Sequence, residues 1–212
     1  MHTESFEHMQ RVVRDYFPKI EKGKVLEVGS MTKKPGYRPI FDDIGWEYSG
    51  CDLEAGPNVD FVLEDPFLFP MEEESYDAII SGQMLEHNAM FWLTFLEMSR
   101  VLKVGGVMAH IAPSRGREHR TPQDCWRFYR DGMTVMGDWA GLEVLSATTD
   151  WTTEDIEARA KNRPWIAKNM RNTTFNPDSK WGDTVGVFLK KSPTGNSPGV
   201  DYIRKFNKIF QG

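Results

Sequence analysis

The chain has 212 residues, of which 40% are hydrophobic and 27% are charged, a composition typical of one globular domain and not of a disordered chain. Its net charge of −5, without a long basic run, disfavours nucleic acid as a partner and favours a small-molecule substrate. Apolar runs are too short for a membrane span, the first residues are too polar for a signal peptide, and two cysteines suggest neither a disulfide framework nor a zinc site. We therefore expect a cytoplasmic protein that does not bind membranes.

The first half of the chain alternates between predicted strands and predicted helices. Residues 5–17 are expected to be helical, because apolar side chains recur at spacings of three and four, with Ser5 as the N-cap. A buried strand follows at 24–28 and ends in Gly29-Ser30, and a polar loop spans 31–36. A second helical face is expected from Tyr37 to Ile44, ended by Gly45. Further strands are predicted at 46–51, 59–63, 76–81 and 107–112, with a helix over 90–102 that Gly105-Gly106 terminates.

This alternation with short links predicts a parallel sheet with right-handed crossovers. The strands are apolar on both faces, as expected when helices cover both sides of the sheet. Ligands bind beyond the carboxyl ends of the strands in such sheets. Three carboxylates occupy these ends, which suits hydroxyl and amine donors better than a phosphate. The strand-end residues are Glu27, Gly29, Asp52, Asp65, Ser81 and Gly82.

The second half is less regular. A polar, arginine-rich loop is expected over 113–130, then a helix at 131–140 and strands at 142–149 and 184–190. The connection 150–183, with a helix interrupted at Pro164, is long enough to be a lid, although a solvated decoration is equally compatible with its composition. We expect one domain over 1–191 and a tail over 192–212. Three apolar side chains of that tail are expected to dock a short helix, namely Tyr202, Phe206 and Ile209.

Several short segments occur in a fixed order, namely Val25-Leu26-Glu27-Val28-Gly29, Gly50-Cys51-Asp52-Leu53, Leu63-Glu64-Asp65 with Phe69-Pro70 and Ser75-Tyr76-Asp77, Leu85-Glu86-His87 and Val101-Leu102-Lys103-Val104-Gly105-Gly106. Together they resemble class I S-adenosylmethionine-dependent methyltransferases, of the broad small-molecule group called type 11. The resemblance implies a Rossmann-like, mostly parallel sheet of seven strands with an antiparallel last strand, in a three-layer α/β sandwich. It also implies S-adenosyl-L-methionine as the cofactor. Ser30-Met31-Thr32 depart from the family, which usually has two more glycines there.

The resemblance assigns roles at the cofactor. Gly29 would allow close approach of the methionine part, which Glu27 would orient, and Asp52 would accept hydrogen bonds from the ribose hydroxyls. Asp65 would accept from the adenine amine. Because Pro66 lacks an N–H, the amide of Phe67 would replace it as donor to the ring. The predicted cofactor residues are Glu27, Gly29, Ser30, Asp52, Leu53, Asp65, Pro66, Phe67, Ser81, Gly82 and Met84.

The loop 115–128 holds the candidate residues for catalysis. His119 has a suitable pKa for a general base, and Asp124 would orient it. Arg120, Trp126 and Arg127 would bind the substrate, since guanidinium groups clamp carboxylates and phosphates. The segment resembles one found in methyltransferases of sugar and glycan pathways. A salt-bridged loop anchored by aromatic side chains is the simpler alternative.

No ligand spacing in the sequence demands a metal ion, although His110, His119, Asp124 and Glu86 could converge, and we expect none. Glu86-His87 is expected to be structural.

The sequence thus predicts a methyltransferase that acts on oxygen or nitrogen of a small polar acceptor, such as a sugar or glycan precursor. A nicotinamide-dependent oxidoreductase is one alternative, disfavoured because the chain lacks the G-x-G-x-x-G segment that a pyrophosphate needs. A non-catalytic cofactor-binding relative is the other, suggested by the missing glycines. The acceptor and the oligomeric state stay open.

Overall fold

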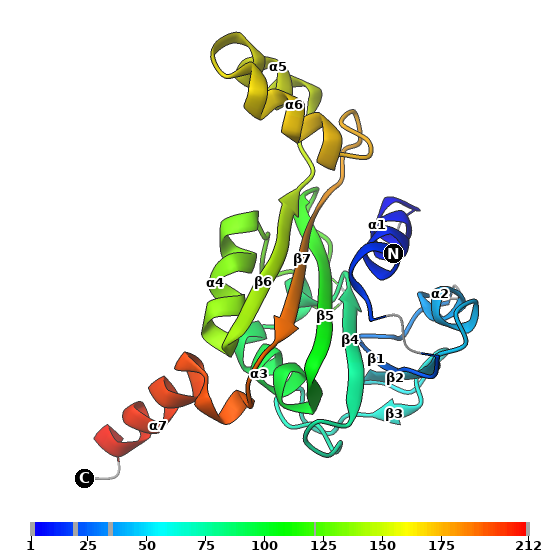
Figure 1. The fold of residues 1–212 in the computed structure, drawn as a ribbon, viewed down its shortest axis with the longest axis vertical. Coiled ribbons are helices and arrows are strands. Elements are labelled where there is room, and N and C mark those ends of the chain that lie inside the picture. The colour runs from blue at the N-terminus through cyan, green and yellow to red at the C-terminus, as the bar shows by residue number, and fades with distance from the viewer. Residues whose placement is uncertain (1–2, 19–20, 34–35, 121, 211–212) are drawn as a thin grey trace.

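A computed structural model describes residues 3–18, 21–33, 36–120 and 122–210, and it contains a seven-stranded sheet between two layers of helices (Figure 1). The strand order is β3-β2-β1-β4-β5-β7-β6. β7 is antiparallel to both of its neighbours, and the other paired strands are parallel. The predicted fold class is therefore confirmed. The strands are β1 (Lys24–Val28), β2 (Glu47–Asp52), β3 (Phe61–Val62), β4 (Tyr76–Gly82), β5 (Leu102–Arg115), β6 (Leu142–Thr149) and β7 (Gly182–Lys190).

Helices cover both faces of the sheet because successive strand residues point to opposite sides. In β4, Ala78 and Ile80 belong to the core under helices α1 (Thr3–Tyr16) and α2 (Arg38–Asp42). Ile79 belongs to the opposite core, which is shared with helices α3 (Phe91–Val101) and α4 (Arg130–Ala140). Each face is therefore closed to water, and the strand ends remain the accessible part of the sheet.

Three predicted details are wrong. Ser5 lies inside α1, and its hydroxyl is 2.6 Å from that of Tyr37, so it is not an N-cap. Gly105-Gly106 does not separate helix from strand, because β5 starts directly after α3 and takes up both glycines where its pairing with β4 shifts register. The predicted third strand shrinks to two exposed residues at the sheet edge.

Two helical segments extend from opposite ends of the sheet (Figure 1). Between β6 and β7, helices α5 (Thr153–Asn162) and α6 (Pro164–Thr173) form a hairpin beyond the carboxyl ends of the parallel strands, broken at Pro164 as predicted. Helix α7 (Pro198–Phe210) follows β7 at the amino ends. The predicted docking of Tyr202, Phe206 and Ile209 is wrong, because all three are exposed, while Val200 and Ile203 pack on the core.

Two short 3-10 turns complete the described secondary structure, η1 (Leu85–His87) and η2 (Thr194–Asn196). None of the helices in the described part of the chain combines the length and apolar character that crossing a membrane requires. Lys34 and Pro35 of the predicted polar loop lie outside the described residues.

Candidate active site

The acids predicted at the strand ends lie on one edge of the sheet. β2, β1 and β4 are adjacent, and their carboxyl ends carry Asp52, Glu27 and Gly82 in that order. In the register of the sheet, Glu27 is opposite Gly50 of β2 and Ile80 of β4. The chain therefore gathers these side chains from segments that are well separated in sequence.

Glu27 is a buried acid at the centre of this edge. The hydroxyl of Tyr48 donates a hydrogen bond to its carboxylate, and the backbone of Tyr37 donates another. Burial nevertheless raises the pKa of Glu27 to about 7, because these bonds only partly replace the lost hydration of the charged form. A cationic ligand group nearby would favour the ionised carboxylate.

The turn after β1 is made with a single glycine. Gly29 has a φ of +79°, and both its amide and that of Ser30 donate to the carbonyl of Cys51, at 2.9 and 3.1 Å. A Cβ on Gly29 would meet the side chain of Met84, so this methionine makes the close approach in the present structure. The buried hydroxyl of Ser30 has no hydrogen-bond partner within the described residues.

Asp52 and Asp65 both accept hydrogen bonds from the backbone. The carboxylate of Asp52 accepts the amides of Met31 (2.9 Å) and Leu53 (2.7 Å), whose apolar side chains are exposed beside it. Asp65 accepts the amide of Phe67 at 2.7 Å. That amide, expected from the sequence to serve the adenine ring, is thus already engaged in a local turn.

Ser81 and Gly82 close the β4 end. The hydroxyl of Ser81 is 2.7 Å from Nδ1 of His110, whose pKa is lowered to about 3 by burial, so this imidazole is neutral at physiological pH. A Cβ on Gly82 would meet the ring of Tyr37. His110 therefore faces the core of the sheet and does not join His119.

The loop 115–128 after β5, in which we predicted the catalytic residues, is held against η1 by hydrogen bonds to the backbone carbonyls of 86–88, and we call it the docked loop. The amide of Cys125 donates to the carbonyl of Glu86 at 2.7 Å, and the side chain of Gln123 donates to the carbonyl of His87 at 2.7 Å. The indole of Trp126 donates to Asn88 at 2.9 Å. These contacts hold 123–126 against 86–88 and determine where His119 lies.

Asp124 links the predicted residues of this loop. Its side chain is 2% exposed, accepts the backbone amide of His119 at 2.8 Å, and forms a two-point ion pair with Arg127. Its Oδ2 also lies 3.4 Å from Nδ1 of His119. Arg120, in contrast, is 77% exposed and paired with the exposed Glu118.

An acid that sequence reasoning took as structural lies between the histidines. Glu86 is fully buried, its Oε1 is 3.7 Å from Nε2 of His87, and the rings of His87 and His119 meet edge to face with centroids 5.0 Å apart. Burial raises the pKa of Glu86 to about 8, with a smaller contribution from the charge of Asp183.

Residues 46–110 match the family model described as "Methyltransferase domain". A demethylmenaquinone methyltransferase of Roseiflexus castenholzii is 30% identical over 100 residues, which are 47% of this chain and 42% of that protein. The match thus spans less than half of the relative's length. Residues 46–110 of this chain therefore resemble a methyltransferase domain, as the sequence predicted.

Solved structures agree with this methyltransferase fold. The [4+2]-cyclase SpnF matches with a TM-score of 0.60 and 16% identity over 87% of this chain and 80% of that one. Phosphoethanolamine N-methyltransferase 2 of Haemonchus contortus, solved with phosphomonomethylethanolamine and S-adenosylhomocysteine, matches with a TM-score of 0.57 and 14% identity over 87% and 53% of the two chains. Identities this low support the fold alone.

The predicted edge of the sheet has features that suit S-adenosylmethionine. Glu27 is a buried acid, Ser30 offers a buried hydroxyl whose hydrogen-bonding capacity is unused among the described residues, and Asp52 adjoins exposed apolar side chains that a purine ring could cover. The donor set therefore fits the predicted cofactor.

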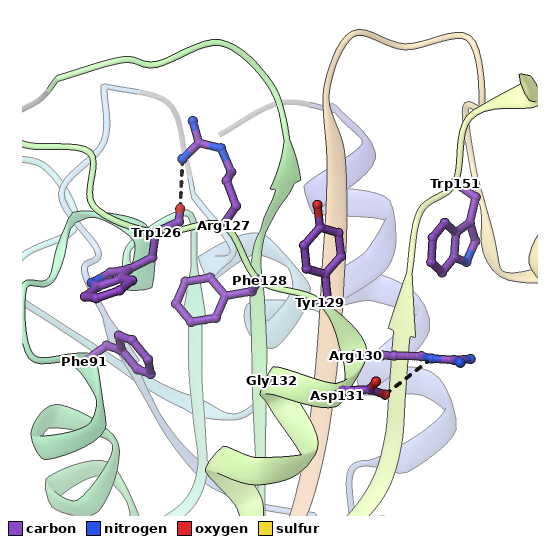
Figure 2. Close-up of a pocket in the computed structure, with 9 residues that line it drawn as sticks. All are labelled: Phe91, Trp126, Arg127, Phe128, Tyr129, Arg130, Asp131, Gly132 and Trp151. Carbon is purple, nitrogen blue, oxygen red and sulfur yellow. Dashed lines mark hydrogen bonds and ion pairs between the residues drawn. The ribbon is translucent and has the colours of Figure 1, made fainter. Parts of the chain in front are cut away.

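A pocket of about 580 Å³ opens beside the docked loop (Figure 2). Of the predicted substrate residues, Trp126 and Arg127 line it and Arg120 does not. The ring of Phe91 packs edge to face on Trp126, and an ion pair of 3.6 Å joins Arg130 to Asp131 at the far side. The full lining is Phe91, Trp126, Arg127, Phe128, Tyr129, Arg130, Asp131, Gly132 and Trp151.

Several other buried polar residues were not predicted from the sequence to belong to a site. His8 of α1 is 2.9 Å from Asp150, which follows β6, and Asp183, the second residue of β7, lies beside them. Tyr37 and Tyr48 contact the cofactor edge from outside the matched motifs. A lone histidine on a helix and acids at strand boundaries give no distinctive pattern, so only the fold brings them together.

Proposed function

We propose that this protein transfers the methyl group of S-adenosylmethionine to an oxygen or nitrogen atom of a small polar acceptor, of the sugar or glycan-precursor class. The observation that supports the proposal is that Glu27 and Asp52 lie at the carboxyl ends of adjacent strands, while His119 lies in the loop that follows the carboxyl end of β5 in the same parallel part of the sheet. The two acids suit the cofactor, and the imidazole suits an acceptor. The sequence of the docked loop, and not the fold, supports the sugar or glycan-precursor class of acceptor.

The strand-end residues would hold the cofactor. Glu27 would pair with the ammonium of its methionine part, and Asp52 would accept hydrogen bonds from the ribose, because each of its oxygens has an acceptor site beyond the one used by the backbone. Asp65 would accept from adenine through the oxygen that does not bind Phe67. The bound cofactor supplies an electrophilic methyl group on a sulfonium.

His119 would accept the proton of an acceptor hydroxyl. Methyl transfer forms an oxygen–methyl bond as the sulfur–methyl bond breaks, with the electron pair staying on sulfur, so the protein has to align the acceptor and remove its proton. Nδ1 of His119 faces Oδ2 of Asp124 and the carbonyl of Arg117, both at 3.4 Å. A proton on Nδ1 leaves Nε2 as the basic nitrogen.

The pocket of Figure 2 would take the body of the acceptor. Five of its nine lining residues are aromatic, among them the exposed Trp126 and Tyr129, and Arg127, Arg130 and Asp131 are charged. Such a lining suits a ring that presents an apolar face together with several hydroxyls. Arg120, at the surface, would contact an anionic extension of the acceptor.

Calorimetry with S-adenosylhomocysteine, followed by transfer of a radiolabelled methyl group to a panel of sugars, sugar nucleotides and amines, tests the function. We expect micromolar binding and transfer to a hydroxylated acceptor, and His119→Gln should abolish transfer while binding is retained. Binding of NAD without S-adenosylhomocysteine would support an oxidoreductase. Binding with no transfer to any acceptor class would support a non-catalytic relative.

A further inference from the structure

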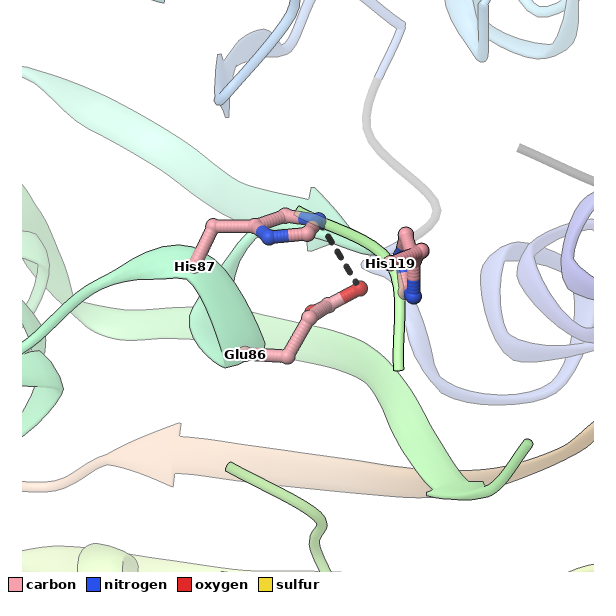
Figure 3. Close-up of side chains that lie close together, drawn as sticks. All are labelled: Glu86, His87 and His119. Atoms are coloured by element: carbon pink, nitrogen blue, oxygen red, sulfur yellow. Dashed lines mark ion pairs between the residues drawn. The ribbon is translucent and has the colours of Figure 1, made fainter. Parts of the chain in front are cut away.

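Glu86, His87 and His119 form a compact cluster beside the docked loop (Figure 3). One ligand-type atom of each residue lies within 4.8 Å of those of the other two. The carboxylate of Glu86 points from η1 into the space between the two imidazoles (Figure 3). The two histidines come from segments that are distant in sequence, so the docked loop creates this cluster.

The carboxylate of Glu86 is the unusual member. It is 0% exposed, and apart from an interaction with its own backbone neither of its oxygens has a hydrogen-bond partner within the described residues. The nearest imidazole nitrogen is 3.7 Å away, too far for a hydrogen bond. Leaving a buried carboxyl group unpaired costs several kcal/mol in general, and such a group calls for a missing partner. Here, the partner would have to sit between the two histidines.

Both histidines are oriented as metal ligands usually are. Nδ1 of His87 donates to the carbonyl of Gln123 at 2.5 Å. Nδ1 of His119 faces Asp124 and the carbonyl of Arg117. A histidine that binds a metal commonly donates its other ring N–H to a carbonyl or a carboxylate, which fixes the tautomer and leaves Nε2 for the ion. His87 has a carbonyl as this partner, and His119 has both a carboxylate and a carbonyl beside its Nδ1.

A second cluster of possible metal ligands among the described residues has more hydrogen bonds of its own than Glu86 has. In the group of His8, Asp150 and Asp183, His8 is within hydrogen-bond distance of Asp150, at 2.9 Å, and the side chain of Gln83 donates to Asp183 at 3.0 Å. That group is therefore partly satisfied by its own contacts. Glu86 has no such contact, and its surroundings favour a cation.

We propose that Glu86, His87 and His119 bind one divalent first-row transition metal ion. Two imidazoles and one carboxylate suit zinc and its neighbours better than magnesium or calcium, which prefer oxygen ligands. Three protein ligands are typical of catalytic sites, which keep an open position for water or substrate. This site departs from the expectation of no metal, which rested on the lack of a ligand spacing within the sequence.

The role of the ion rests on the proposed function, whereas its binding does not. An acceptor hydroxyl in the open position would lose its proton to water more readily, because a bound cation lowers the pKa of a coordinated hydroxyl. The cation would then replace the free imidazole of His119 in this task, since a coordinated Nε2 cannot also take up a proton. His87 and Glu86 would position the ion.

The test uses the full chain, stripped of metal with EDTA and titrated with Co²⁺ in a calorimeter and by visible absorption. We expect one Co²⁺ per chain, with d–d bands of a nitrogen- and oxygen-ligated ion. Glu86→Gln and His119→Gln should weaken binding by at least ~10-fold. The matched control is His8→Gln, which removes a buried histidine from the other group and should leave the Co²⁺ affinity unchanged.

S-adenosylhomocysteine binding by each variant shows that it is folded. Wild-type protein that binds S-adenosylhomocysteine but no stoichiometric Co²⁺ would overturn the metal site and leave the proposed function standing. Equal Co²⁺ binding by Glu86→Gln and His119→Gln, or its loss in His8→Gln, would overturn the assignment to this cluster. Tight Co²⁺ binding without methyl transfer would support the site while contradicting the proposed function.

Discussion

Arg127 holds both carboxylate oxygens of Asp124, with Nη1 2.6 Å from Oδ1 and Nη2 2.8 Å from Oδ2. This hydrogen bonding holds the pKa of Asp124 well below its usual range. The guanidinium of Arg127, which the sequence predicted to bind the substrate, therefore mainly stabilises the loop itself. Because the same carboxylate accepts the amide of His119, the pair positions the predicted catalytic residue.

Arg127→Ala should therefore loosen the loop. We expect a loss of about 1–3 kcal/mol in the free energy of unfolding, the usual cost of removing a charged hydrogen-bond partner, measured by urea denaturation. Arg120→Ala is the matched control: its exposed ion pair with Glu118 is screened by solvent and should contribute little to stability. Equal stability of the two variants would show that the Asp124 pair does not order the loop. If Arg120 binds the acceptor, its variant raises KM without loss of stability.

Asp52→Asn should weaken binding of S-adenosylhomocysteine by about tenfold or more, because a carboxylate that accepts from a ribose diol contributes about 1.5–3 kcal/mol. Asparagine keeps the size of the side chain, and its carbonyl oxygen can still accept a hydrogen bond from the amide of Met31 or of Leu53. Calorimetry measures the affinity. Asp77→Asn, at the amino end of β4 where it pairs with Lys103, is the control and should bind normally. Unchanged affinity in Asp52→Asn would remove Asp52 from the cofactor site.

The raised pKa of Glu27 predicts that the free energy of unfolding depends on pH. Its folded-state pKa of about 7 lies above the ordinary 4.5, so between these values the folded state keeps a proton that the unfolded state has lost. Stability should fall as pH rises through this window, by up to about 3 kcal/mol, and level off above it. Glu27→Gln should remove the slope and be the more stable protein at pH 8. Urea denaturation at pH 5 to 8 measures it, with the exposed Glu47→Gln as control. A parallel slope in Glu27→Gln would contradict the assignment.

Cofactor binding should respond to pH in the opposite direction. An ammonium group beside Glu27 favours the ionised carboxylate, so below pH 7 part of the binding free energy is used to remove a proton. We expect the affinity for S-adenosylhomocysteine to rise by up to about fivefold from pH 6 to pH 7 and by only about twofold more above it. Calorimetry in buffers of different ionisation enthalpy should detect proton release at pH 6. Binding without proton release would place Glu27 away from the ammonium.

The sequence predicted the sheet well because burial on both faces leaves a continuous apolar signal. Ala78-Ile79-Ile80 in β4 is such a run, and the acids that end β1 and β2 stand out against it. Local conflicts were less visible. Ser5 lies within α1, where its hydroxyl is near that of Tyr37, a residue that the fold brings from the start of another helix.

The candidate site was predicted only in part. Asp124 and His119 lie in one loop, so their proximity follows from the chain, whereas Glu86 joins them through backbone contacts such as that from Cys125. Backbone pairing between loops leaves no side-chain pattern. The same limit explains Phe67, whose amide was expected to serve adenine but is taken by Asp65, two residues earlier.

The α5–α6 hairpin offers the last prediction. Its base is narrow, since the amide of Trp151 is 3.0 Å from Oγ1 of Thr174, and it has a small core of its own around Ile156. Replacing 153–173 with a short Gly-Ser linker should therefore leave the sheet folded and S-adenosylhomocysteine affinity within about threefold. Because the hairpin stands at the carboxyl ends of the strands, we expect kcat/KM for the acceptor to fall by about tenfold or more, as for a lost lid.

A matched variant separates a lid from a decoration. Trp165 is 69% exposed on α6 and would be buried if the hairpin closed over a bound acceptor. Trp165→Ala should leave stability within about 0.5 kcal/mol, as for other exposed positions, while lowering kcat/KM in the same direction as the deletion. Trp165 fluorescence should shift to the blue on acceptor binding if closure occurs. Full activity of both variants would identify the hairpin as a surface decoration.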